Sequence, residues 1–299
     1  MLDFLLHVGI VGAIYGIAAV SLNFQAGVSG LLNFGQVAFF GLGAYGAGIA
    51  TYHHAPEWMG VLGGAAVAAI AGAAVGRLGR TLAADYWAIA TLALAETLRL
   101  IFLNEEWLAR GALGIGSIPG LWGALSGTTR DAAILVTVLI ILGVIYLVAQ
   151  RLTLVQFGRA ARLMREQPNL VVAMGHDVVS IKMRVMAVSA VMAAIGGALF
   201  TYYISFIGPG QLLPFETFLV WAMIVIGGMG NYRGVIVGAF LVEVVYVGTR
   251  FVNDYLPLPA ESAASVRLLL VGVALLGFLL FRPGGLIPET LRDVDAARR

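Results

Sequence analysis

The sequence contains no cysteine and only one lysine. Without cysteine there is no disulfide, no thiolate nucleophile and no cysteine-ligated metal. The lysine, Lys182, does not follow a glycine-rich phosphate loop, so the chain has no P-loop for ATP. The four histidines, His7, His53, His54 and His176, lack a spacing typical of a metal site. These absences argue against an ATP-hydrolysing or metal-dependent enzyme.

Charge is also scarce. Charged residues make up 11% of the 299 residues and hydrophobic residues 60%, and the mean hydropathy is +0.94. Soluble domains carry about 25% charged residues, so this chain has too few to cover the surface of a water-soluble fold. The net charge of +2 is too small to suggest nucleic-acid binding. Lipid must therefore be the solvent for much of the chain.

Long apolar stretches occupy most of the sequence. Nine of them approach the length of about 20 residues that crosses a bilayer as a helix. They are 4–24, 34–52, 58–75, 86–103, 132–148, 185–206, 215–230, 235–252 and 263–281. Because their hydrophobicity does not alternate, helices are favoured over barrel strands. We predict an all-α polytopic membrane protein with one transmembrane domain, 1–299, and a bundle of about nine helices, eight to ten being possible.

The basic residues predict the orientation. With Arg77 and Arg80 in the cytoplasm, 13 of the 18 basic residues fall in cytoplasmic segments, and Arg110 and Arg130 fall in outside loops. The C-terminus is then cytoplasmic, and nine spans would put the N-terminus outside. The topology near the N-terminus stays open, because 25–36 could form a re-entrant or broken helix.

Asn33, Gln36 and Tyr45 lie within a glycine-rich stretch of membrane-depth sequence. Polar groups at that depth are tolerated where they face protein or a water-filled cavity, and transporters tend to bind solute at interrupted helices. We therefore predict that these three residues line a translocation pathway. Close packing of the neighbouring small residues is an alternative of equal weight.

Ionisable residues also fall inside predicted spans. Glu96 and Arg99 lie three residues apart on one face of the fourth span, and Glu243 lies near the centre of the eighth. An ionised group there costs about 2.5–3.5 kcal/mol on insertion scales unless it is paired or hydrated. An ion pair that braces the bundle is favoured for Glu96 and Arg99, while Glu96 and Thr97 are also assigned to the predicted pathway. The partner of Glu243 stays open.

The longest predicted cytoplasmic connection between spans is about 151–184. Pro168 fits the first position of a helix, and Gly175 fits the residue after its end. Leu170, Val171 and Met174 would fall on one side of this two-turn helix. An apolar face outside the membrane indicates docking into a partner protein, with an interfacial helix on lipid headgroups as the alternative.

Six stretches, taken in order, resemble one family of transport proteins. They include Gly30-Leu-Leu-Asn-Phe-Gly-Gln within 30–45, and the others are 86–100, 111–119, 158–175, 226–238 and 281–286. Together they resemble the LivM-type permease subunits of branched-chain amino acid ABC transporters, a family that also contains urea and amide permeases. The resemblance spans nearly the whole chain, and its specificity lies in the order and spacing of these elements.

This resemblance implies the partners and the setting. The chain would pair with a LivH-like second permease, two ATP-binding subunits (LivG-like and LivF-like) and an extracytoplasmic solute-binding protein, as a multi-pass protein among the lipids of the bacterial plasma (inner) membrane. The partner ATPases would bind ATP and Mg, and this chain would bind no cofactor and would not be an enzyme. It would import branched-chain amino acids or related small solutes by alternating access.

The resemblance also implies that the short helix is a coupling helix that contacts an ATPase. The expected coupling residues are Arg162, Arg165, Glu166, Leu170, Val171, Met174 and Gly175. The family usually has an acidic pair and alanines here, whereas this chain has Glu166-Gln167-Pro168. The choice of ATPase and the exact substrate therefore stay open.

Two other classes of function compete with an ABC permease. An ion-coupled secondary transporter or channel for a small polar solute would place carboxylates at the midplane, and Glu243 is the candidate. A membrane-embedded enzyme would need a nucleophile or a metal cluster, which the sequence does not offer.

Overall fold

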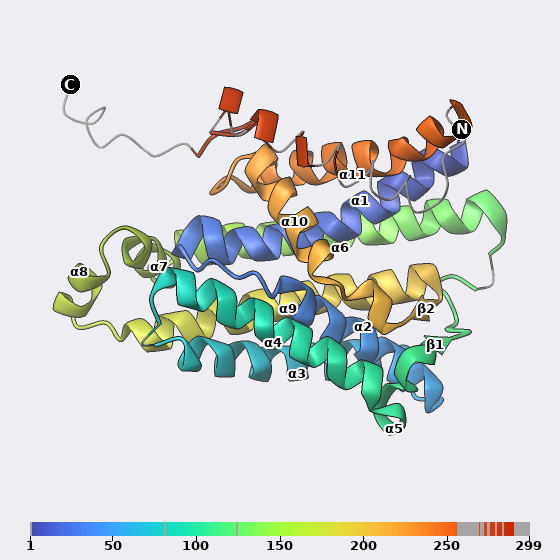
Figure 1. The fold of residues 1–299 in the computed structure, drawn as a ribbon, viewed down its shortest axis with the longest axis horizontal. Helices are drawn as coiled ribbons and strands as arrows, with labels where there is room; N and C mark the ends of the chain where they lie inside the picture. Colours follow the sequence, from blue (N-terminus) through green and yellow to red (C-terminus); the bar gives the residue numbers. More distant parts are fainter. Residues whose placement is uncertain are drawn as a thin grey trace.

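A computed structural model describes residues 2–80, 82–123 and 125–255, and then 269, 272–273, 276–278, 280–282 and 284–289, with backbone alone for 249–255. Most of the described helices run along the long axis of the molecule (Figure 1). The described helices are α1 (Leu2–Asn23), η1 (Phe24–Val28), α2 (Gln36–Tyr52), α3 (Glu57–Leu78), α4 (Ala84–Asn104), α5 (Glu106–Ala109), η2 (Gly111–Leu113), α6 (Gly127–Leu154), α7 (Gln156–Glu166), α8 (Pro168–Ala173), α9 (Val178–Ile204), η3 (Pro209–Gln211), α10 (Pro214–Gly227) and α11 (Tyr232–Tyr255).

Six helical segments of the described residues are long and apolar enough to cross a membrane. They are Leu2–Val28, Glu57–Leu78, Ala84–Asn104, Gly127–Leu154, Val178–Ile204 and Pro209–Gly227. The prediction of an all-α membrane protein is therefore confirmed at this level. The number nine is not established, and the ninth predicted span, 263–281, lies largely outside the described residues.

Small residues bring α2, α3 and α9 close together at the centre of the bundle. A Cβ atom on Gly43 of α2 would overlap the backbone carbonyl of Ala194 in α9, and one on Gly197 would overlap that of Phe40. Glycine at these positions lets the two helix backbones touch, as is common in membrane helix pairs. The small-residue packing considered from the sequence is therefore present.

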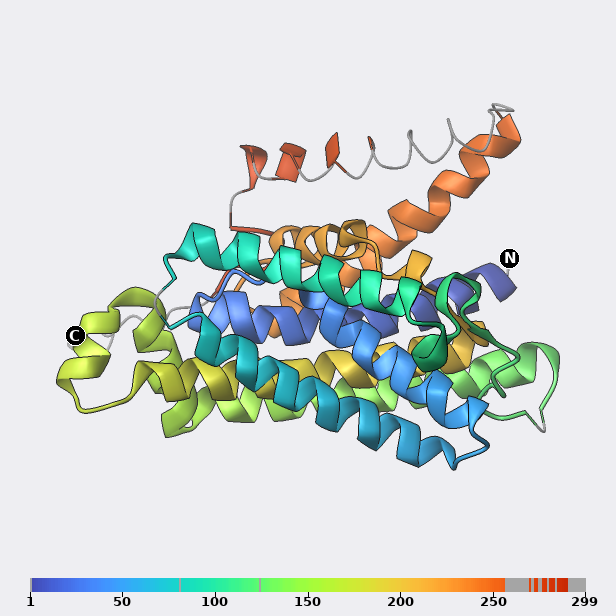
Figure 2. The same cartoon turned by 60° about the horizontal axis from the view of Figure 1, so that its bottom comes forward.

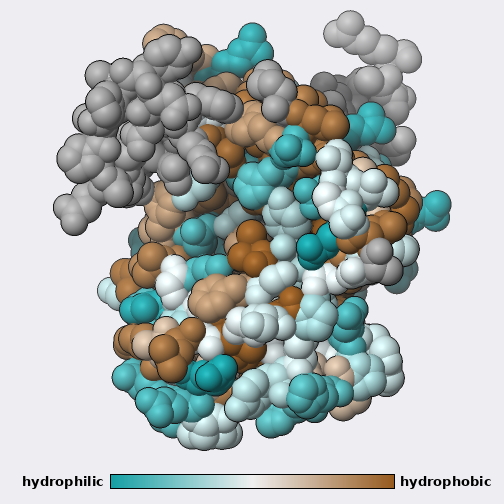
Figure 3. Space-filling model, turned by 90° about the vertical axis from the view of Figure 1, so that its right-hand side faces the viewer, coloured by the Kyte–Doolittle hydropathy of each residue, from teal (hydrophilic) through white to brown (hydrophobic). Residues whose placement is uncertain are grey.

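The two ends of the bundle differ. Helices α7 and α8 project beyond the long helices at one end (Figures 1 and 2). The opposite end carries α5 and the antiparallel strands β1 (Ile115–Gly116) and β2 (Phe206–Ile207), in which Ile115 lies opposite Ile207. Figure 3 looks onto this opposite end, where hydrophilic residues interrupt the hydrophobic surface.

Regular α-helix in the first span ends at Asn23, well before α2 begins at Gln36. α1 continues into η1, a π-helical turn, and residues 30–35 then run back into the bundle without helical structure before α2 begins. Gly30 has φ +72°, a left-handed conformation that glycine adopts without strain. The sequence analysis expected a re-entrant or broken helix at 25–36, and the structure shows helical structure interrupted within this stretch, between Val28 and Gln36.

Candidate functional site

Buried polar side chains stabilise the break between α1 and α2. Gln25 Nε2 donates to Gln36 Oε1 (3.1 Å) and to Ser189 Oγ (2.6 Å). Asn33 Nδ2 donates to the same Gln36 oxygen (3.0 Å), and Gln36 Nε2 donates to Ser21 Oγ (2.6 Å). The structure thus brings together Asn33 and Gln36, two of the predicted pathway residues. Their hydrogen bonds within the protein fix the shape of the break.

Side chains from α4 and α10 bind the backbone of the same segment. Trp221 Nε1 donates to the carbonyl oxygen of Asn33 (3.0 Å), and Thr217 Oγ1 accepts from the amide of Val37 (3.1 Å). Thr91 of α4 is buried against this segment and accepts a hydrogen bond from its backbone. The beginnings of α2 and α10 therefore meet inside the bundle, an arrangement typical of solute sites in transporters.

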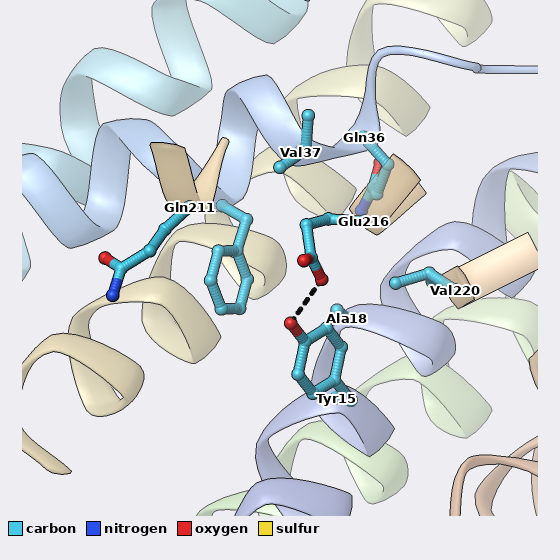
Figure 4. Close-up of a pocket in the computed structure, with 8 residues that line it drawn as sticks. Tyr15, Ala18, Gln36, Val37, Gln211, Glu216 and Val220 are labelled. Atoms are coloured by element: carbon cyan, nitrogen blue, oxygen red, sulfur yellow. Dashed lines mark hydrogen bonds between the residues drawn. The ribbon is translucent and has the colours of Figure 1, made fainter. Parts of the chain in front are cut away.

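A small cavity lies beside this meeting point (Figure 4). Its volume of about 10 Å³ leaves room for about one water molecule. Its lining comes from α1, α2, η3 and α10 and consists of Tyr15, Ala18, Gln36, Val37, Phe40, Gln211, Glu216 and Val220. The Tyr15 hydroxyl donates a hydrogen bond of 2.5 Å to Glu216 Oε2. Glu216 is the one charged residue in this lining.

Glu216 and Tyr15 were missed by the sequence analysis, which considered Glu243 as the membrane-depth carboxylate. Glu243 is 2% exposed and lies against Gly12 of α1. It also interacts electrostatically with Tyr15. The signal for Glu216 was its place as the one acidic residue of the predicted span 215–230.

Tyr45 lies apart from the polar break. Its ring stacks on Phe102 with 3.9 Å between ring centroids, and it lines a separate, mostly apolar cavity of about 490 Å³ between α2, α3 and α4. The hydroxyl group has no hydrogen-bond partner among the residues that the structure describes. A pathway role for Tyr45 stays a prediction.

Glu96 and Arg99 form the expected ion pair on α4, with 2.5 Å between Arg99 Nη2 and Glu96 Oε1. The two side chains are 36% and 18% exposed, respectively. The Thr97 hydroxyl donates to the carbonyl oxygen of Ala93 in its own helix and is exposed. These residues therefore lie on the outward surface of α4, outside the cluster around Gln36.

The short helix predicted after Gln167 is present as α8. Pro168 is its first residue, and Gly175, with φ +79°, follows its end. Leu170 and Met174 are 44% and 60% exposed, whereas Val171 is 0% exposed. The expectation that all three share one side was therefore wrong for Val171, which packs into the subunit itself.

Arg165 of α7 connects this region to the helix break. One guanidinium nitrogen donates to the carbonyl oxygen of Gly27 in the π-helical turn, and another lies 3.0 Å from Glu289 Oε2. The backbone amide of Gly230 donates to Asn23 Oδ1 (2.8 Å) at the same junction. Movement of α7 would therefore act directly on the end of α1.

The other two charged residues assigned to coupling lie nearby. Arg162 lines a polar cavity of about 400 Å³, and its Nε has no hydrogen-bond partner within the described part of the chain. Glu166 is exposed, with Oε1 3.9 Å from Arg165 Nη2. No group of three His, Asp or Glu side chains in the described residues could hold a metal ion.

Comparison with known proteins gives the family. The model of the branched-chain amino acid transport system / permease component family matches residues 4–279. The chain belongs to this permease family. The resemblance to LivM-type permeases inferred from the sequence is therefore confirmed. No solved structure matches the chain.

Three relatives of this permease carry similar descriptions. It is 30% identical to the probable branched-chain amino acid transport permease protein LivM of Methanocaldococcus jannaschii, over 92% of this chain and 91% of that protein. It is 30% identical to the high-affinity branched-chain amino acid transport system permease protein LivM of Salmonella typhimurium, over 93% of this chain and 68% of the relative. The LivM protein of Escherichia coli is 28% identical with the same coverage.

Proposed function

We propose that this chain is the transmembrane permease subunit of an ABC importer for branched-chain amino acids, and that separate ATPase subunits drive its alternating access. The observation that carries the proposal is the helix break inside a chain of this permease family. Broken helices at the centre of a bundle supply solute sites in transporters. The partner ATPases bind ATP and Mg, and this chain contributes the path and no catalytic group.

The proposed topology has about nine spans, with the N-terminus outside and the C-terminus in the cytoplasm of a bacterial cell. It is supported by the basic residues at the end of the bundle that carries α7 and α8. They lie at or just beyond the ends of α3 and α6, in α7 and near the start of α9, and include Arg77, Arg80, Arg151, Arg159, Arg162, Arg165, Lys182 and Arg184. Such an excess is typical of the cytoplasmic side of the plasma (inner) membrane.

The proposed path passes the meeting point of α2 and α10. Asn33 and Gln36 shape it, and Glu216 faces the cavity there. Glu96 and Thr97 would line the path from α4 where a second permease closes against that helix. Tyr45 would contribute from its separate cavity in the half of the bundle that carries the strands.

A LivH-like second permease is proposed to cover α4. The Glu96–Arg99 pair lies in a span long and apolar enough to cross the membrane and is partly exposed on the surface of this chain. Charged side chains within spans almost always face protein or a water-filled cavity rather than lipid. A partner helix therefore suits this face better than lipid does.

Substitution of Arg99 tests this interface. Arg99→Leu is expected to lower recovery of the second permease with this chain severalfold, because it leaves the partly exposed Glu96 carboxylate unpaired against the partner helix. The double variant Glu96→Leu/Arg99→Leu removes both charges and should recover more partner than the single variant. Quantitative co-purification measures both. Equal recovery of the second permease with wild type and with Arg99→Leu would mean that the partner does not bind at this face of α4.

The exposed apolar face of α8 is proposed to dock into a groove on one ATPase, LivG-like or LivF-like. Leu170 and Met174 supply the contact, Gly175 ends the helix, and Arg165 transmits the motion to the end of α1. The extracytoplasmic binding protein would deliver solute at the opposite end of the bundle.

Reconstitution tests the function as a whole. The complete complex in proteoliposomes should take up leucine only when ATP is available on the side of the ATPases and loaded binding protein on the other side. This chain alone, without nucleotide, should give no flux. Uptake by the isolated chain, driven by an ion gradient, would overturn the proposal in favour of a secondary transporter.

A further inference from the structure

We infer that Glu216 and Tyr15 form the subsite that recognises the ammonium group of the transported amino acid. The inference rests on the proposed function and adds the chemical class of ligand group that this cavity takes. Tyr15 of α1 and Glu216 of α10 lie 201 positions apart in the sequence and form a hydrogen bond in the structure. The ligand is a zwitterion with a primary ammonium group and an aliphatic side chain.

Glu216 has no counter-charge in the ion pairs of the described residues. Glu216 lies in the first turn of α10 and faces a cavity inside the bundle. The ion pairs formed by the described residues involve Arg99 and Arg165, and none includes Glu216. Carboxylates in membrane-spanning segments are costly unless they are paired or hydrated. A cationic ligand would supply the charge that the described lining lacks.

Tyr15 is the second polar residue of this subsite. Its hydroxyl group donates a hydrogen bond to Glu216 Oε2. An ammonium group placed beside this hydroxyl group could donate a hydrogen bond to the same carboxylate. A hydroxyl group can both donate and accept, whereas an ammonium group only donates. When an ammonium group binds Glu216, the Tyr15 oxygen is therefore free to accept a second N–H. The tyrosine thus satisfies the carboxylate in the empty site and helps bind the ligand in the filled one.

The remainder of the lining suits the other parts of such a ligand. Ala18, Val37, Phe40 and Val220 present apolar surface around the carboxylate, which matches an aliphatic side chain. The amino-terminal end of α2 begins at Gln36 on the same cavity, and the positive end of a helix dipole favours the ligand carboxylate. Charge and shape therefore point to a zwitterion rather than to an uncharged amide.

The cavity in this structure is too small for an amino acid. Its volume of about 10 Å³ holds about one water molecule, so α10 must move away from α1 and α2 before ligand enters. That movement breaks the Tyr15–Glu216 hydrogen bond. The contracted state is the empty, closed form of the subsite.

Transport by the complete complex tests this inference. Glu216→Gln should lower the initial rate of ATP-dependent leucine uptake by at least about tenfold, because it removes the charge and keeps the shape. Glu216→Asp should retain part of the rate. Tyr15→Phe should lower the rate at saturating loaded binding protein by about two- to fivefold, as expected for one lost hydrogen bond. Glu105→Gln and Tyr52→Phe, at exposed positions, are the matched controls and should behave as wild type.

A second measurement addresses the ligand class and does not depend on turnover. Leucine should raise the thermal stability of the wild-type complex in nanodiscs without binding protein, and 2-hydroxy-4-methylpentanoate, which lacks the ammonium group, should not. The shift with leucine should be lost in Glu216→Gln and reduced in Tyr15→Phe. Co-purification of the partner subunits shows whether each variant assembles.

The outcomes separate this inference from the function on which it rests. Wild-type complex without ATP-dependent uptake would contradict the proposed function. Normal uptake by Glu216→Gln, or equal stabilisation by leucine and the hydroxy acid, would overturn the ammonium subsite alone. Uptake that follows a proton gradient and loses that dependence in Glu216→Gln would assign the carboxylate to a proton instead, and would also overturn it.

Discussion

Gly43→Ala is expected to reduce the amount of folded permease in the membrane to less than about a tenth, because the added methyl group costs about 3 kcal/mol in a packed helix contact. It would overlap the backbone carbonyl of Ala194, and a backbone atom cannot rotate away as a side chain can. Relief requires separation of α2 from α9, the contact at the centre of the bundle. Fluorescence-detected size exclusion of the solubilised subunit, with its Tm, measures the loss.

Gly63→Ala is the matched control for this prediction. It lies in α3, and a Cβ atom there would meet no atom within 4 Å. Alanine also has a higher helix propensity than glycine, by about 1 kcal/mol. We therefore expect wild-type recovery or slightly more. Wild-type recovery of Gly43→Ala would mean that the α2–α9 contact is looser than described, and equal losses in both variants would mean that the loss does not arise from the overlap with Ala194.

The double variant Leu170→Glu/Met174→Glu should insert and assemble its transmembrane part, yet lose substrate-stimulated ATP hydrolysis by at least about tenfold. Each buried apolar side chain contributes about 1.5–3 kcal/mol to an interface, and two new carboxylates would oppose docking of α8. Both side chains are exposed in this chain, so their replacement leaves its own packing intact. ATPase assays on the reconstituted complex measure the change.

Two control variants distinguish loss of coupling from an effect of added charge or from misfolding. Leu113→Glu introduces one negative charge at an exposed position at the other end of the bundle, and should leave stimulation unchanged. Val171→Glu should instead destabilise the subunit, because that side chain is fully buried. Unchanged stimulation in the double variant would exclude α8 as the coupling element.

Local signals in the sequence were enough for several elements. Continuous apolar stretches located the long helices, since few other arrangements satisfy a backbone in lipid. Pro168 and Gly175 delimited α8 correctly, because proline at a first helical position and glycine after the last one act through local backbone geometry. Glu96 and Arg99 paired as expected, because residues three apart on a helix are neighbours.

Features that depend on the crossing of distant helices could not be predicted in the same way. Glu216 looked like an ordinary acidic residue in the first turn of a helix, where the helix dipole favours one. Tyr15 looked like any aromatic residue of an apolar span. Their contact exists because α10 crosses α1, which no local pattern encodes.

Two features of the structure were predicted wrongly or left open because the local sequence is compatible with more than one arrangement. Val171 was assigned to the exposed side of α8, but a helix of 6 residues is too short for spacing to decide which side faces the protein. The break after η1 was left open because glycine-rich sequence is compatible with both close packing and interruption of a helix. In this chain the glycine-rich sequence allows close packing of α2 and also contains the interruption before α2.

The bond between Arg165 and the Gly27 carbonyl has a mechanical consequence. A push on α7 and α8 reaches α1 at a turn where regular α-helical hydrogen bonding has already given way to π-helical bonding, so bending there disrupts few of them. In the proposed coupling, a displacement of α7 would reach the chain at this turn, a few residues before the segment that leads to Gln36. The long helices could then reorient as rigid bodies, and the backbone change would be confined to the π-helical turn Phe24–Val28.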